Sequence, residues 1–159
     1  MICYASAMAT DGTAPSDGLA SVSLAADLSF LMARANALSL AAGNAALRPF
    51  GLSVRSFSVL ALTVDGHRPT QRDLATFLRL DPSQVVALVD GLQQRGFVER
   101  RPDPNDRRAN VVVATGEGRG VYSSAVVAAR AAERELHSAL DPAEREQLAA
   151  LLRRVAFVD

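Results

Sequence analysis

The residues of this chain best suited to binding chemistry are a group of arginines. They follow a segment that begins with polar side chains. Five arginines lie between residues 95 and 108, partly offset by three acidic residues. Guanidinium groups bind phosphate oxygens and enter narrow minor grooves, where the negative potential of DNA is concentrated. Ser83 and Gln84 lie just upstream, and a Gln side chain can pair bidentately with adenine. These residue types point to recognition of duplex nucleic acid.

The overall charge restricts how such recognition could work. All 17 basic residues are arginine, 17 residues are acidic, and the formal net charge is zero. A neutral chain does not resemble a nonspecific nucleic-acid coat, so affinity must come from the local arginine cluster.

Enzyme chemistry finds no support in the sequence. There is no Gly-rich phosphate loop and no paired metal-ligand motif, and His67 stands alone in a loop. Cys3 is the single cysteine, so it cannot form an internal disulfide, which fits a reducing cytoplasm. We predict no catalytic residue, no metal site and no cofactor.

A helix must carry the polar residues at 83 and 84. Asp81 can cap it, Pro82 suits its first position, and Gln84 completes a D-x-x-Q capping box. Gly96 is expected to stop it. Its apolar residues recur at helical spacing and form one buried face, made of Val85, Leu88, Val89 and Leu92.

A second helix and a hairpin flank this one. Residues 70–78 begin with a T-x-x-D cap and form a short helix, and residues 79–81 form the turn between the two. Downstream, residues 97–102 and the β-branched run 110–114 have strand character, and 103–108 form a charged tip. Two helices joined by a tight turn and followed by a hairpin are typical of a winged helix-turn-helix, whose second helix enters the major groove.

Apolar helices are expected on both sides of this unit. The first runs from Ser23 to Pro49, and its seam has the spacing of helices that pack lengthwise, which favours a dimer interface over the core of one subunit. Ser53 caps a helix that closes at Asp65 and Gly66. Thr115 caps a long helix that runs to about Leu140. Residues 141–144 combine a capping Asp, a Pro at the first helical position and an acidic residue in the first turn, so they predict the start of a last helix.

The predicted fold is therefore mainly α, a winged helix-turn-helix with a small β-hairpin wing, flanked by N- and C-terminal dimerisation helices. Residues 1–20 are expected to form a flexible arm, and 21–159 a single domain. Within that domain, 21–49 and 115–158 are the dimerisation helices and 53–114 the winged unit.

Several motifs between Thr70 and Thr115 carry a family resemblance. They are T-x-x-D-L-A, L-D-P-S-Q-V-V-x-L-V-D-x-L, R-G-F-V-E-R, D-P-N-D-R-R and V-V-V-A-T. This ordered series resembles the MarR family of bacterial transcriptional regulators, and the wing signature is its most specific part. The resemblance covers the central third of the chain closely and the flanks by helix pattern alone.

The resemblance implies a ligand-responsive repressor that acts as a homodimer on a pseudo-palindromic operator in double-stranded DNA. The two recognition helices would lie roughly 34 Å apart and enter successive major grooves. Ser83 and Gln84 are the base-reading candidates. At the positions of Val86 and Ala87, many family members carry Thr and Arg. This chain therefore lacks those polar contacts, and Ala87 could make only an apolar contact with thymine methyl groups.

At the wing tip, the resemblance gives three residues separate roles. Asp106 holds the hairpin, Arg107 meets phosphate, and Arg108 enters the minor groove. Without the resemblance, the same residues would be exposed ion pairs of little energetic consequence.

A regulator of this kind implies an effector, and many relatives bind small aromatic or phenolic acids between the dimer helices and the winged lobes. Arg34, Asn36, Arg55 and Tyr122 could line such a pocket, but the sequence assigns no ligand-binding residue. The alternative function is a winged-helix protein-interaction module with weakened DNA binding, which the neutral charge and Val86-Ala87 motivate. No run has the length of a membrane span and no secretory signal is evident, so we expect a cytoplasmic protein without a membrane partner.

Overall fold

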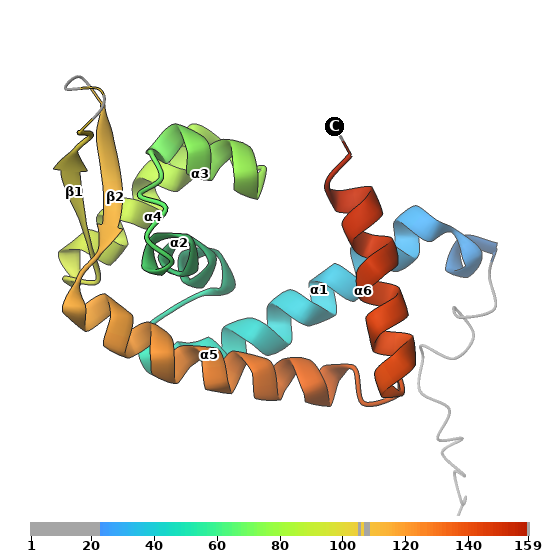
Figure 1. Ribbon diagram of the computed structural model, residues 1–159. Coiled ribbons are helices and arrows are strands. Elements are labelled where there is room, and N and C mark those ends of the chain that lie inside the picture. Colours follow the sequence, from blue (N-terminus) through green and yellow to red (C-terminus); the bar gives the residue numbers. More distant parts are fainter. Residues whose placement is uncertain (1–22, 105, 107–108, 159) are drawn as a thin grey trace, which may run out of the picture. The chain divides into compact units, whose positions relative to one another are not determined.

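The structure is a computed structural model that describes residues 23–104, 106 and 109–158 (Figure 1). The chain divides between Ala37 and Leu38 into two compact units. The described part of the first unit contains a 3-10 helix, η2 (Ser23–Ala26), and the beginning of α1 (Leu28–Leu47). The first helix was predicted to start at Ser23, which is wrong by five residues. The reason is local, because the Asp27 carboxylate accepts a hydrogen bond from the Phe30 amide at 2.8 Å and so caps α1.

The second unit contains the end of α1 and every later element. A 3-10 turn, η3 (Arg48–Phe50), follows α1 and ends at Gly51, whose φ is 67°. The remaining elements are α2 (Val54–Val64), α3 (Gln71–Leu78), α4 (Pro82–Gln94), β1 (Val98–Pro102), β2 (Asn110–Ala114), α5 (Gly116–Leu136) and α6 (Pro142–Ala156).

The two strands form the predicted wing. They pair antiparallel, with Val98 opposite Ala114 and Pro102 opposite Asn110. Figure 1 shows this hairpin standing beside α2, α3 and α4, with β2 leading directly into α5. The mainly helical winged helix-turn-helix predicted from the sequence is thereby confirmed.

Side-chain caps explain where most helices begin. Ser53 with Ser56, Thr70 with Asp73, and Asp141 with Glu144 form reciprocal capping boxes. The cap by Asp81 is also present, but the predicted reciprocal contact with Gln84 is replaced. Asp81 Oδ1 instead accepts from the backbone nitrogen of Ser83 at 2.8 Å and from its hydroxyl at 2.5 Å.

The end of α5 differs from the prediction. The helix stops at Leu136 and not near Leu140, because His137 caps it and a turn follows in which the Leu140 amide donates to the His137 carbonyl. The Arg145 guanidinium donates to the same carbonyl at 3.3 Å, which holds the start of α6 against this turn. The turn lets Asp141 adopt the extended conformation that its cap requires.

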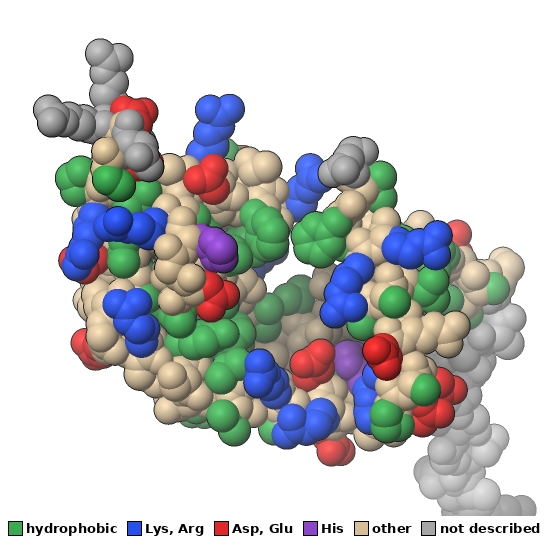
Figure 2. Space-filling model, in the orientation of Figure 1, with side chains coloured by type: hydrophobic (Ala, Val, Ile, Leu, Met, Phe, Trp, Pro, Cys, Tyr) green, Lys and Arg blue, Asp and Glu red, His purple; other side chains and the backbone are tan. Residues whose placement is uncertain are grey.

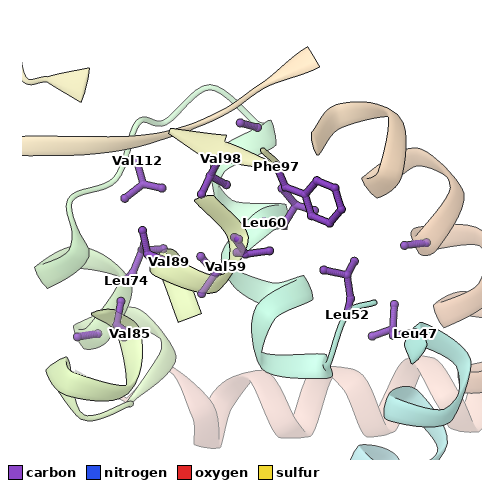
Figure 3. Packing of buried hydrophobic residues seen from close by; sticks show 14 residues of the cluster. Leu47, Leu52, Val59, Leu60, Leu74, Val85, Val89, Phe97, Val98 and Val112 are labelled. Atoms are coloured by element: carbon purple, nitrogen blue, oxygen red, sulfur yellow. The ribbon is translucent and has the colours of Figure 1, made fainter. Parts of the chain in front are cut away.

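One hydrophobic core joins α2, α3, α4 and the wing. Figure 3 shows side chains from these elements directed toward one another. The fully buried members are Leu47, Val59, Leu60, Leu74, Val85, Val89, Leu92, Val98, Val112 and Ala114, with Ala125 from α5. Val85, Val89 and Leu92 form the buried face predicted for α4, whereas Leu88, predicted with them, is only partly buried. The opposite face of α4 is accessible to a ligand.

Two contacts fix the ends of this core. The Asn44 side chain in α1 accepts a hydrogen bond from the Val54 amide at 2.8 Å and so fastens α1 to the start of α2. Gly118 in α5 lies so close to Phe97 that a Cβ there would overlap the Phe97 carbonyl oxygen. None of the helices in the described part of the chain is both long and apolar enough to cross a membrane.

Candidate nucleic-acid interface

The outer face of α4 presents the residues that were predicted to read bases. Ser83, Gln84 and Ala87 are all exposed, and Val86 beside them is 41% exposed. They are outward because Val85, which lies between Gln84 and Val86, is fully buried and sets the rotation of the helix. The structure therefore brings the predicted base-reading residues onto one accessible surface.

The start of α4 carries a negative charge on the side chain of Asp81. Hydrogen bonds from the Ser83 hydroxyl and amide lower the pKa of the Asp81 carboxyl, so Asp81 is an anion at this helix start. An anion there interacts favourably with the helix dipole. Because the Ser83 hydroxyl donates to Asp81, its oxygen is left as a hydrogen-bond acceptor, and the predicted contact of Ser83 with DNA stays a prediction.

Arg100 in β1 has a different role from the one that its place in the arginine cluster suggested. Its guanidinium donates to Gln71 Oε1 from Nη2 at 2.6 Å, to Asp90 Oδ1 at 2.6 Å and to Gln93 Oε1 at 2.9 Å. These partners lie in α3 and α4, so Arg100 joins both helices to the wing. Its guanidinium is therefore committed to contacts within the protein.

The alternation of faces along β1 could have predicted from the sequence that Arg100 points toward the helices. Residues two apart on a strand share a face, so Arg100 lies on the same side of β1 as buried Val98. Arg101 lies on the other side, pairs with Glu99 at 2.5 Å and is 53% exposed. The space-filling view shows such basic and acidic side chains next to one another over the wing strands (Figure 2).

The tip of the wing is described only in part. Arg107 and Arg108 lie outside the described residues, so their predicted contacts with phosphate and minor groove are carried forward as predictions. The Asp106 carbonyl accepts from the Ala109 amide at 3.0 Å, and the Asp103 amide donates to the Ala109 carbonyl at 2.9 Å. These backbone bonds close the hairpin, while the stabilising role of the Asp106 side chain also stays a prediction.

The residues considered for an effector pocket are not gathered by the described contacts. Tyr122 is half-buried and stacks on Phe57, with ring centroids 5.4 Å apart and an angle of 19° between the rings. Arg34, Asn36 and Arg55 are exposed.

This geometry, a short helix, a tight turn, an exposed second helix and an antiparallel hairpin, defines a winged-helix DNA-binding protein. A profile of the MarR family matches residues 50–109. A MarR-family transcriptional regulator from Rhodococcus sp. RHA1 is 39% identical in sequence and has a TM-score of 0.81, over 86% of this chain and 97% of that one. The chain belongs to the MarR family of transcriptional regulators, which confirms the resemblance seen in the sequence.

Other relatives add information about ligands and DNA. The solved structure of CouR from Rhodococcus jostii RHA1, bound to p-coumaroyl-CoA, is 39% identical and has a TM-score of 0.79, over 87% of this chain and 98% of that one. A mutant of MarR from E. coli, in complex with operator DNA, is 27% identical with a TM-score of 0.73, over 80% and 92%.

Among curated relatives, the HTH-type transcriptional regulator BilQ of Clostridium symbiosum is 30% identical over 92 residues. That alignment covers 57% of this chain and 64% of BilQ, just under two thirds of its length. BilQ and the Rhodococcus sp. RHA1 protein are both named as transcriptional regulators.

Proposed function

We propose that this chain is a cytoplasmic repressor that binds a pseudo-palindromic operator as a homodimer and releases it when a small effector binds. The observation that carries the proposal is the outer face of α4, where Ser83, Gln84 and Ala87 are exposed beside a wing that Arg100 fastens to the same helix. A helix held in this way can enter a major groove while the wing tip reaches the adjacent minor groove. The function is one of binding, and we assign it no catalytic residue, metal or cofactor.

Exposed apolar residues on the flanking helices support the dimer. In α6 the predicted apolar stripe is 40–54% exposed, at Leu148, Leu151, Leu152 and Val155. Large apolar side chains in the described part of α1 are exposed as well, at Leu28, Leu31 and Leu38. Exposed large apolar side chains along a helix are characteristic of protein interfaces, and a second copy of the chain is the partner that the family relationship favours.

The relatives support the two binding activities. One was solved with operator DNA and another with p-coumaroyl-CoA. By analogy we assign this chain a duplex-DNA partner and a small aromatic or phenolic effector.

A salt titration of DNA binding tests the proposal. A duplex from the region upstream of the gene is titrated with the wild type and with an Arg107→Ala, Arg108→Ala double variant, by fluorescence anisotropy. We expect tight wild-type binding and a log K against log salt slope that the double variant flattens by about two per subunit. As a control, Arg119→Ala changes an exposed arginine on α5 and should leave the slope unchanged. Equal slopes for the wild type and the double variant would remove the wing tip from the interface.

A further inference from the structure

The exposed stripe along the first turns of α4 has an apolar centre. Ser83, Val86, Ala87 and Asp90 follow one another at i, i+3, i+4 and i+7, so they share one side of the helix. All four residues are exposed, and Val86 is 41% exposed although its side chain is entirely apolar. The methyl groups of Val86 and Ala87 therefore lie on the surface that was proposed to enter the major groove.

The polar residues at the two ends of this stripe are held by contacts within the protein. The Ser83 hydroxyl donates its single proton to Asp81 Oδ1 at 2.5 Å. The Asp90 carboxylate accepts from the Arg100 guanidinium at 2.6 Å and is thereby paired with a cation. Neither side chain can donate a hydrogen bond to a base edge, and the centre of the stripe offers only methyl groups.

The recognition helix also lacks the side chains that recognise guanine. Guanine presents two acceptors in the major groove, N7 and O6, and Arg or Lys is the usual donor to them. The 13 residues of α4, all of which the structure describes, include neither Arg nor Lys. Arg95, which follows the helix, donates to the Gly51 carbonyl at the end away from Ser83. A guanine in the groove would therefore meet no cationic donor on α4.

Gln84 supplies the hydrogen-bonding group beside this methyl surface. Its side chain is exposed, and the capping contact that was predicted for it is made by Ser83 instead. The Gln amide presents one donor group and one acceptor, and these match N7 and N6 of adenine. The start of α4 thus combines apolar methyl groups with one amide that fits adenine.

We propose that α4 selects its site by thymine methyl groups, which Val86 and Ala87 contact, and by an adenine that Gln84 binds, without reading a guanine. The C5-methyl group of thymine lies in the major groove, and its contact with an exposed valine removes apolar surface of both partners from water. Val86 is then a specificity-determining residue, because its two methyl groups present more apolar surface than Ala87 does. This inference deepens the proposed function and rests on the entry of α4 into the major groove.

The experiment starts from a duplex that the full-length protein selects out of a random-sequence library. That duplex is synthesised in three forms: unmodified, with deoxyuridine in place of every thymidine, and with 7-deazaguanine in place of every guanine. Uracil keeps the hydrogen-bonding groups of thymine and lacks only its methyl group, whereas 7-deazaguanine lacks the N7 acceptor. Both changes lie in the major groove, so contacts of the wing tip with the minor groove are not altered. Fluorescence anisotropy gives the dissociation constant of each form.

Two matched variants connect the effect of the methyl group to one side chain. Val86→Ser removes both methyl groups of the side chain at the proposed contact. Val127→Ser makes the same change at a valine of α5 that is 66% exposed and lies outside the recognition helix. The ratio of the two dissociation constants within one variant cancels any general loss of affinity, and circular dichroism checks each fold.

We expect the wild type to bind the uracil duplex about tenfold more weakly, because each of two subunits loses about three- to fivefold for one contacted methyl group. In Val86→Ser this difference between the duplexes should largely disappear, and in Val127→Ser it should match the wild type. The 7-deazaguanine duplex should bind the wild type within about twofold of the unmodified duplex, because no donor on α4 uses the missing N7.

Three results would overturn the inference while leaving the proposed function intact. They are equal affinity of the wild type for the thymine and uracil duplexes, a uracil effect that persists in Val86→Ser, and a loss of about tenfold with 7-deazaguanine. The first and third comparisons need no variant, so they decide the matter even if Val86→Ser does not fold. If the wild type enriches no sequence from the library, sequence-specific binding itself is refuted, and the proposed function fails together with the inference.

Discussion

The guanidinium of Arg100 lies 2.6 Å from the carboxylate of Asp90, and this ion pair joins the wing to the recognition helix. The arginine side chain is 25% exposed and the aspartate side chain 49%, so water screens the pair only in part. Gln71 in α3 and Gln93 in α4 accept hydrogen bonds from the same guanidinium. Through this one side chain, the wing is held at a set distance from α3 and α4.

Replacing Arg100 should therefore lower the stability of the protein. Arg100→Ala leaves three side chains without their donor, and we expect a loss of about 1–3 kcal/mol in the free energy of unfolding. Arg101→Ala is the matched control: its exposed pair with Glu99 contributes about 0–1 kcal/mol, and the side chain faces away from the helices. Urea denaturation measures both variants. Equal losses for Arg100→Ala and Arg101→Ala would show that the internal network does not stabilise the wing.

The close approach of α5 to β1 predicts intolerance of any side chain at Gly118. A Cβ there would overlap the Phe97 carbonyl oxygen, which is backbone and cannot move aside cheaply. We expect Gly118→Ala to destabilise the fold by about 1–3 kcal/mol, as overpacking does. Gly120→Ala, two residues later in the same helix, meets no atom within 4 Å and should stabilise by about 0.5–1 kcal/mol through helix propensity. Thermal denaturation should move in opposite directions for the two variants.

The capping box of α3 predicts a pH dependence. The Thr70 hydroxyl and then its amide donate to the Asp73 carboxylate, at 2.7 and 2.9 Å, and lower the pKa of Asp73 below its ordinary value. Because the pKa of Asp73 is lower in the folded protein than in the unfolded chain, its ionisation stabilises the fold fully at a pH above the unfolded-state pKa. This stabilisation is lost as the pH falls through the folded-state pKa. Thr70→Val removes the hydroxyl donor, so the pKa of Asp73 should rise and helix stability should fall by about 1 kcal/mol. Carboxyl carbon shifts in an NMR titration measure the pKa, and an unchanged value would contradict the assigned cause.

Gln84 should decide sequence preference more than overall affinity. If its amide pairs with adenine, Gln84→Ala costs about 1–3 kcal/mol on the preferred site and little on a site changed at that base pair. Gln94→Ala, an exposed glutamine at the other end of α4, is the control and should leave the preference intact. Binding curves on the two sites provide the comparison. An equal loss of affinity for both DNA sites would mean that Gln84 contacts the DNA backbone and not a base.

The exposed stripe of α6 predicts the oligomeric state. Leu148→Glu with Leu152→Glu places two charges on the apolar face and should convert a dimer to monomers in analytical ultracentrifugation. Ala150→Glu changes a neighbouring exposed residue that lies outside this stripe, and it should leave the dimer intact. A double leucine variant that sediments like the wild type would move the interface away from α6.

The starts of α2, α3 and α6 and the wing strands were predictable because their causes are local. Ser53, Thr70 and Asp141 each bond to a backbone amide three residues ahead, so the sequence motif contains the complete interaction. The run 110–114 consists mainly of β-branched residues, and it forms β2 within the predicted bounds. The burial of α4 followed from its apolar periodicity alone, which also placed Gln84 on the outer face.

Contacts between distant parts of the chain required the tertiary structure. Arg100 and Gln71 are 29 positions apart, and only the folded chain shows that this arginine fastens the wing while Arg101 beside it faces outward. Arg95 likewise donates to the carbonyl of Gly51, 44 positions away, and no motif connects these two residues. Periodicity indicates which face of an element is buried, but the partner of a long side chain depends on how separate elements pack. The sequence by itself thus determined the helices, the wing and the family, and the packing decided which arginines hold separate elements together and which face outward.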